Sequence, residues 1–204
     1  MLAAAAAIGC AWPAMAAREN YKMDAGVNQA AQLAEMLSLY DALCLTAFPS
    51  DGALFQKVVA LKDTKPITGA ALTDIFHGDP GLAWAYRGKS SRFLIAVEAA
   101  PFHACTVRAT TIGFGENKKY RAIADRYETK AGGFHDIDLV DQVNGDIRTV
   151  LAGERKDNPD GSTEALMILV ATPASEALRK AGYTGVDVRL VHQIAVPAVA
   201  VAKP

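Results

Sequence analysis

The chain has 204 residues, of which 51% are hydrophobic and 21% are charged. This balance is typical of a globular chain and excludes the charged, apolar-poor composition of disorder. The formal net charge is -1, so the sequence carries no electrostatic footprint for nucleic acid or an acidic membrane. The length suits one domain with one core. Beyond the N-terminus the longest apolar run is 165–171, far short of the roughly 20 residues of a membrane-spanning helix.

The first residues have the features of a secretory signal peptide. Residues 2–12 are apolar and uncharged, and Ala14-Met15-Ala16 places small residues at both positions that signal peptidase reads. We therefore expect cleavage between Ala16 and Ala17. The usual positive segment is missing, because Arg18 is the first basic residue of the chain.

Two alternatives compete with this cleavage. A buried Ala-rich helix is disfavoured because Pro13 would break it. Ala7-Ile8-Gly9-Cys10 resembles the lipobox of bacterial lipoproteins, in which the Cys is lipidated and becomes the first residue. The match departs at Ala7, where Leu is usual, and the apolar stretch before Cys10 is short. We favour conventional cleavage, with a lipid anchor at Cys10 as the alternative.

Cleavage would leave two cysteines, Cys44 and Cys105, in a compartment that oxidises thiols. We expect them to form a disulfide. Closing a loop of about 60 residues costs the unfolded chain roughly 4 kcal/mol of entropy in the loop-closure model. A catalytic thiol is the alternative, since His103 lies two residues from Cys105 on an expected strand. A shared face of a strand does not by itself activate a thiol, so we favour the disulfide.

The N-terminal third is expected to be helical. Apolar residues recur at steps of three and four and mark one face of a helix that ends before Pro49, namely Leu33, Leu37, Tyr40, Cys44 and Phe48. Ser50 can cap a second helix that carries Leu54, Phe55, Val58 and Leu61. Thr68 can cap a short third helix that ends at Phe76.

Strands dominate the rest of the chain. Three apolar segments separated by turns indicate an antiparallel meander, at 82–87, 93–98 and 103–110. A helical stripe follows at 120–127, with its basic residues on a solvated face. Three further strands, a short helix and a last strand are expected at 137–143, 147–154, 165–171, 175–181 and 186–194.

Segregated helices and consecutive strands joined by hairpins indicate an α+β fold with an antiparallel sheet. We expect about six or seven strands, with the N-terminal helices forming a layer packed on one face of the sheet. The expected organisation is a signal peptide at 1–16, a single α+β domain at 17–196 and a loose C-terminal tail at 197–204.

Three local motifs have a plainer explanation than a binding site. Gly88-Lys89-Ser90 resembles the end of a phosphate-binding loop, but that motif needs glycine where Ala83 stands, so we expect a hairpin turn. His135-Asp136-Ile137-Asp138 could bind a metal, but its first two side chains would face opposite sides of a strand, which favours a strand edge. Trp84 and Tyr86 would share a face, and core packing is favoured over ligand stacking. We expect no catalytic residue, cofactor or metal.

One stretch resembles a known group of proteins. Cys44 on a helix, Trp84 after Gly-Leu-Ala, and Cys105-Thr106-Val107 after a hairpin occur in this order within residues 40–108. This order is similar to that of small uncharacterised exported proteins of Gram-negative bacteria. The resemblance implies a disulfide and an exported location, and it offers no activity to carry over.

Two functions fit these features. The first is a periplasmic or secreted, non-catalytic protein that binds a partner protein or a small ligand, because the distinctive residues serve folding and export. The second is an envelope hydrolase with catalytic residues dispersed along the chain. A cavity that gathers two carboxylates, or His103 with His192 and a carboxylate, would favour the enzyme. An exposed apolar patch without convergent titratable groups would favour the binding protein.

Overall fold

The computed structural model describes residues 26–111, 113 and 117–196. The expected signal peptide at 1–16, the cleavage site at Ala16 and Ala17, Cys10 and the tail at 197–204 lie outside the described residues. The helices are α1 (Gln29–Tyr40), the π-helical turn η2 (Asp41–Leu45), α2 (Asp51–Ala60), α3 (Ala70–Phe76), α4 (Asn117–Ala131) and α5 (Glu176–Lys180). The strands are β1 (Thr64–Ile67), β2 (Gly81–Arg87), β3 (Arg92–Glu98), β4 (Phe102–Thr111), β5 (His135–Asp136), β6 (Val140–Asn144), β7 (Ile147–Asp157), β8 (Thr163–Pro173) and β9 (Val186–Ala195). No helix in these ranges is long and apolar enough to cross a membrane.

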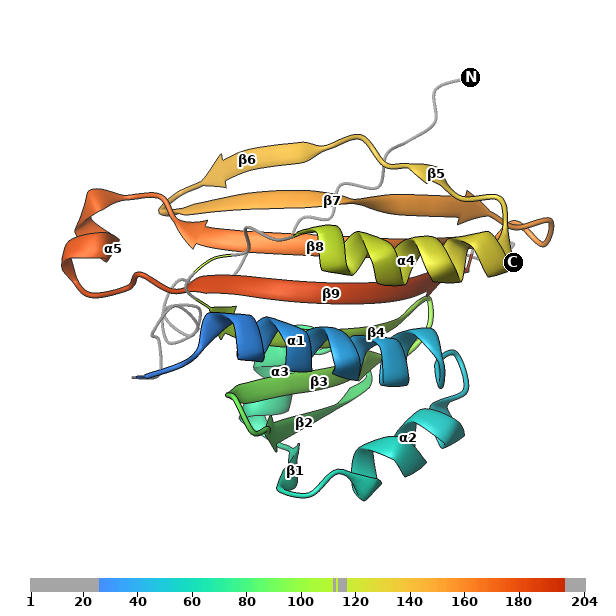
Figure 1. Cartoon of the computed structure of the whole chain (residues 1–204), viewed down its shortest axis with the longest axis horizontal. Coiled ribbons are helices and arrows are strands. Elements are labelled where there is room, and N and C mark those ends of the chain that lie inside the picture. The colour runs from blue at the N-terminus through green and yellow to red at the C-terminus, as the bar shows by residue number, and fades with distance from the viewer. Residues whose placement is uncertain (1–25, 112, 114–116, 197–204) are drawn as a thin grey trace, which may run out of the picture.

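Within the described ranges, nine strands form one antiparallel sheet in the order β1-β2-β3-β4-β9-β8-β7-β5, with β6 also paired to β7. The fold is therefore α+β with a large antiparallel sheet, as the sequence predicts. Figure 1 shows that the sheet has two halves. In each half a long helix, α1 or α4, precedes strands that step from an edge of the sheet to its centre, where β4 pairs with β9. The two halves thus share the order of a long helix followed by strands.

The expected six or seven strands fall short of the nine in the described residues. β1 is missed because it is a short edge strand in which Lys65 and Pro66 are exposed, and proline is tolerated at an edge where its missing N–H has no partner. The strand expected at 137–143 is β6, which begins at Val140, and the short strand β5 before it is missed. The registers of β5 and β6 with β7 differ by one residue. Every residue of β6 is exposed, so this edge has no alternation of burial to predict it.

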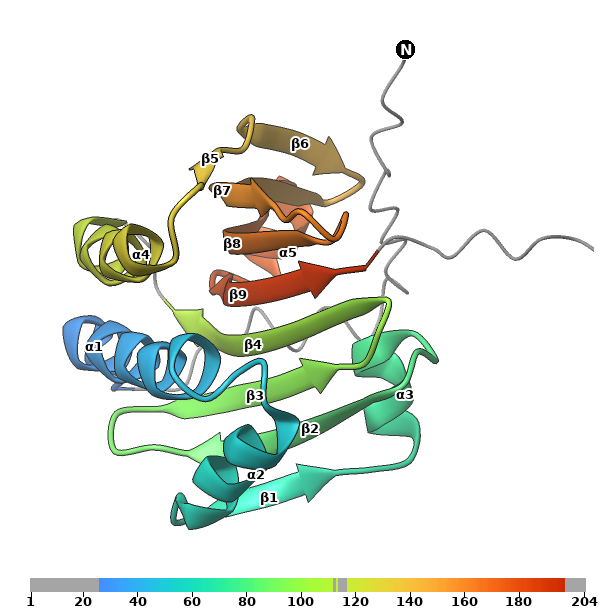
Figure 2. The ribbon, with the colours of Figure 1, turned by 90° about the vertical axis from the view of Figure 1, so that its right-hand side faces the viewer.

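Helices cover both faces of the first strands. α1, η2, α2 and α4 lie on one face of the sheet and α3 lies on the other (Figure 2). On β2 and β3, Trp84 and Ile95 point into the main core under α1 and α2, while Ala83 and Ala96 pack against Phe76 of α3. Since both faces of these strands are apolar, both need a cover. The N-terminal helices therefore do not form the single layer that the sequence predicts.

The starts of the helices follow their caps. Ser50 and Ser175 accept hydrogen bonds from backbone N–H groups three residues on, at 3.3 and 3.2 Å, and begin α2 and α5 as expected. Thr68 does not cap α3, which begins after Gly69 in a left-handed conformation with φ of 64°. The first helix, expected to run to Phe48, is α1 followed by the wider turn η2.

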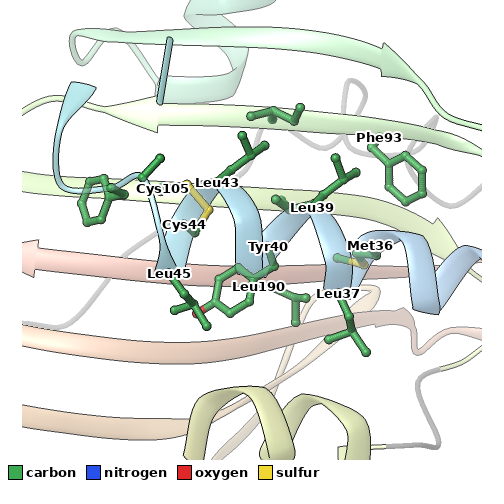
Figure 3. Close-up of a cluster of buried hydrophobic side chains, with 14 of the residues drawn as sticks. Met36, Leu37, Leu39, Tyr40, Leu43, Cys44, Leu45, Phe93, Cys105 and Leu190 are labelled. Atoms are coloured by element: carbon green, nitrogen blue, oxygen red, sulfur yellow. A yellow bond between two sulfur atoms is a disulfide. The ribbon is translucent and has the colours of Figure 1, made fainter. Parts of the chain in front are cut away.

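Cys44 and Cys105 form the predicted disulfide between η2 and β4, with Cα atoms 5.3 Å apart. Both cysteines are fully buried. Figure 3 shows the bond inside the apolar cluster that α1 and η2 place on the sheet, together with Tyr40, Leu43 and Leu190. The bond joins residues separated by 61 positions and fastens the first helical segment to the middle of the sheet.

Candidate functional site

A groove of about 260 Å³ lies between α2 and the ends of β2 and β3. It is lined by Asp51, Leu54, Phe55, Gly81, Leu82, Trp84, Val97 and Ala99. Three of these residues, Leu54, Trp84 and Val97, also belong to the main apolar core. The groove is therefore an opening of the core to the surface, next to α2.

Two half-exposed side chains form its walls. Leu54 and Val58 are buried and hold α2 on the sheet, so their neighbour Phe55 lies at the edge of the helix and is 47% exposed. Leu82 is 52% exposed, and alternation along β2 places it on the same face as Trp84. The ring centroids of Phe55 and Trp84 are 6.2 Å apart. Large apolar side chains exposed together around a hollow mark an interaction site.

Trp84 and Tyr86, the aromatic pair noted in the sequence, pack against different aromatic rings. Trp84 is buried, as core packing predicts, and it also lines the groove. Tyr86 stacks on Phe93, with ring centroids 6.1 Å apart. Phe55 is not among the site residues predicted from the sequence, although a signal for it is present. Leu54 and Phe55 are adjacent on a helix, so they cannot both face the core.

Asp51 lies at the rim of the groove and is its only charged lining residue in the described part of the chain. Asp51 is the first residue of α2, and its Oδ1 lies 2.8 Å from Nε2 of His103 on β4. The side chain of Asp51 is 67% exposed and that of His103 is 23% exposed, so solvent screens this pair. Phe48 packs on His103, with ring centroids 4.5 Å apart. The accessible carboxylate of Asp51 thus lies next to an apolar groove.

His192 contacts Phe48 as well, but it lies inside the core. Its ring centroid is 4.9 Å from that of Phe48, and the residue is fully buried. Nδ1 of His192 lies 2.6 Å from the backbone oxygen of Cys44, and Nε2 lies 2.8 Å from Oε1 of Glu164. Tyr127 donates to the same oxygen of Glu164 at 2.6 Å. Both ring nitrogens of His192 thus lie within hydrogen-bond distance of an oxygen atom.

These contacts set the charge of the buried cluster. The hydrogen bond from His192 holds the pKa of Glu164 below its usual value, against the effect of burial and with a further hydrogen bond from Tyr127. Burial and the bond to Glu164 raise the pKa of Tyr127. Because no substrate can touch a ring without exposed surface, we interpret this cluster as a structural link between η2, α4, β8 and β9.

The Gly88-Lys89-Ser90 motif lies in the turn between β2 and β3, which agrees with the predicted hairpin. The turn binds a carboxylate of the protein itself. Glu35 of α1 accepts hydrogen bonds from the backbone N–H of Lys89 at 2.9 Å and of Ser90 at 2.8 Å, and a further bond from the Ser90 hydroxyl. Burial opposes these bonds, yet together they hold the pKa of Glu35 below its usual value. The motif therefore fastens the hairpin to α1.

The histidine and carboxylate cluster that begins at His135 lies at an edge of the sheet. His135 and Asp136 form β5, are exposed, and pair with Arg155 and Glu154 of β7. Across the residues that the structure describes, no group of three His, Cys, Asp or Glu side chains is placed to hold a metal ion. The position agrees with the predicted strand edge.

Neither a family model, nor a curated protein, nor a solved structure matches this chain. Function is therefore inferred from the side chains themselves. His103 and His192 both pack against Phe48, but His103 reaches Asp51 at the groove while His192 is enclosed in the core. Each histidine has its own carboxylate partner, and the two pairs do not share the groove.

Proposed function

We propose that this chain is an exported, non-catalytic binding protein that holds an apolar group of its ligand in the groove between α2 and β2. The observation that carries the proposal is the pair of half-exposed side chains, Phe55 and Leu82, beside the ring of Trp84. Exposed apolar surface costs roughly 25 cal/mol per Å², and a bound apolar group would recover this free energy.

Export to the periplasm or beyond is part of the proposal. The apolar segment and the small residues within 1–16 favour a signal peptide, and residues 40–108 resemble exported proteins of Gram-negative bacteria. The bond between Cys44 and Cys105 supports an oxidising compartment, since thiols are kept reduced in the cytosol.

An envelope hydrolase has less support. Hydrolysis by the chain's own side chains needs a nucleophile or an activated water beside a general base. The described lining of the groove contains no hydroxyl, thiol or amine, and Asp51 is its one ionisable residue. The second pair, His192 and Glu164, lies in the core. We therefore place the binding protein first.

Fluorescence of Trp84 tests the groove. Removal of 1–16 would leave Trp84 as the sole tryptophan, because the other one, Trp12, lies in that segment. Addition of 2-phenylethanol to the chain that begins at Ala17 is expected to change the emission of Trp84 in a saturable way. For so small a ligand we expect a Kd on the order of 1 mM.

Two matched variants make this test specific. Phe55→Ala removes one wall of the groove and should weaken binding by about fivefold. Phe102 is 48% exposed, close to the value for Phe55, but alternation on β4 places it on the opposite face from Cys105. Phe102→Ala should therefore leave the affinity unchanged. A linear, unsaturable response of Trp84, or equal effects of the two substitutions, would contradict the proposal.

A further inference from the structure

The groove is acidic at one end. Asp51 is the sole charged residue in its described lining, and neither Lys nor Arg accompanies it there. Oδ1 of Asp51 lies 2.8 Å from Nε2 of His103, while 67% of the Asp51 side chain is open to solvent. The carboxylate can therefore meet a cationic group of a ligand without releasing His103.

The nearby acidic residues of β3 and of the turn before β2 do not line the groove. Glu98 follows the lining residue Val97, so alternation along β3 places it on the opposite face, and Asp79 precedes β2. Burial and the charge of Asp79 raise the pKa of Glu98. Lys57, the basic residue of α2, donates instead to the backbone oxygen of Ala42 at 3.2 Å. Asp51 is therefore the charge that favours a cation at this end of the groove.

The size of the groove and its two rings define the ligand further. A volume of about 260 Å³ is below the roughly 300–1,000 Å³ of sites for drug-sized ligands, so the groove suits one ring or one branched alkyl group. Phe55 and Trp84 contribute two aromatic rings to the lining, and aromatic rings attract cations as well as apolar groups. An apolar group and a positive charge can thus bind side by side.

Resting on the proposed function, we infer that the ligand of this groove is a small organic cation, an aromatic or branched alkyl amine whose ammonium group meets Asp51. Its apolar group lies among Phe55, Leu82 and Trp84. Because the carboxylate is largely exposed, the ion pair raises the affinity by no more than about fivefold at low ionic strength.

Three probes of similar shape and different charge test this inference: 2-phenylethylammonium, 2-phenylethanol and 3-phenylpropionate. Each is titrated into the chain that begins at Ala17 at about pH 8, where imidazoles are ordinarily neutral, with the emission of Trp84 as the readout. The expected order of affinity is cation, alcohol, anion. Asp51→Asn should abolish the preference for the cation. Asp74→Asn, at an exposed position of α3 on the other face, is the matched control and should preserve the preference.

The possible results separate this inference from the proposed function. A preference for the cation that disappears both in Asp51→Asn and at high salt supports the inference. Equal affinity for the cation and the alcohol, a preference for the anion, or a preference that survives Asp51→Asn would overturn the inference and leave the apolar groove in place. Absence of binding by all three probes would overturn the inference and the proposed function together.

Discussion

The two halves of the sheet, β1–β4 and β5–β9, each follow a long helix, yet their buried acidic and histidine residues are unequally divided. In the first half, α1 and η2 are held by apolar packing, by the hydrogen bonds of Glu35 with the β2–β3 turn and by the bond between Cys44 and Cys105. The second half contains all of the buried acidic and histidine residues among those described, which are Glu154, Glu164, Asp187 and His192. They pair across elements, since Glu154 meets Arg121 of α4 and Asp187 meets Arg108 of β4.

This difference predicts different sensitivities for the two halves. A covalent link depends on the redox state, whereas buried ion pairs depend on pH and on the presence of both partners. The groove lies in the first half, where its walls, Phe55 and Leu82, take no part in the buried polar contacts of the second half. Substitutions there should therefore affect binding more than folding.

Loss of the disulfide is the largest expected effect. Cys44→Ala together with Cys105→Ala should lower the free energy of unfolding by about 4 kcal/mol, because the unfolded chain regains the entropy of a long open loop. Unfolding in urea, followed by circular dichroism, measures the change. Reduction of the unsubstituted chain is the control and should shift the midpoint in the same direction. A midpoint that both treatments leave in place would show that the bond adds no stability.

Loss of the contact between His192 and Glu164 in the second half should have a somewhat smaller effect. His192→Phe keeps a ring beside Phe48 but removes a hydrogen-bond partner of the buried carboxylate of Glu164, at a cost of about 3 kcal/mol. Adding Glu164→Leu should recover much of this loss, since no unpaired charge is left in the core. The urea unfolding midpoints of the single and double variants measure whether the two residues are coupled. If the double variant lost the sum of the two single effects, the residues would not be coupled.

The smallest expected effect is on stability in acid. The pKa of Glu164 in the folded protein lies below its usual 4.5, so its contribution to stability is complete above about pH 4.5 and is lost as the pH falls through the folded value. Glu164→Gln should remove this part of the acid dependence. Asp187 and Glu35, whose pKa values are also lowered, keep their contributions to the acid dependence.

The difference in Tm between the unsubstituted chain and Glu164→Gln should therefore shrink as the pH falls from neutral. A difference in Tm that stays constant with pH would contradict this account.

Some features of the second half could be read from the sequence. Alternation along 186–194 predicts β9, and the same alternation places His192 on the buried face with Val188 and Leu190. A histidine at such a position needs buried hydrogen-bond partners, so the pattern contains a signal for the polar cluster. Its partner Glu164 lies on a different strand, and only the pairing of β8 with β9 brings the two together. That pairing is a property of the topology and has no local signal.

In the first half, the positions of helices were harder to predict than their existence. Ala83 and Ala96 are small enough to suit an open or a covered face, so they do not show that α3 packs on them. The groove depends on how far α2 extends over β2, which leaves Leu82 uncovered. Helical and strand periodicity fix which side of an element is apolar, but not which neighbour covers it.

Locating a bound probe by nuclear magnetic resonance tests the central claim most directly. In amide correlation spectra of the labelled chain that begins at Ala17, added 2-phenylethylammonium should shift most strongly the signals of residues that line the groove, among them Asp51, Phe55 and Leu82. The signal of Phe102, equally exposed on the opposite face, should stay in place. Shifts centred on Phe102, or spread evenly over both faces of the sheet, would contradict the groove as the binding site.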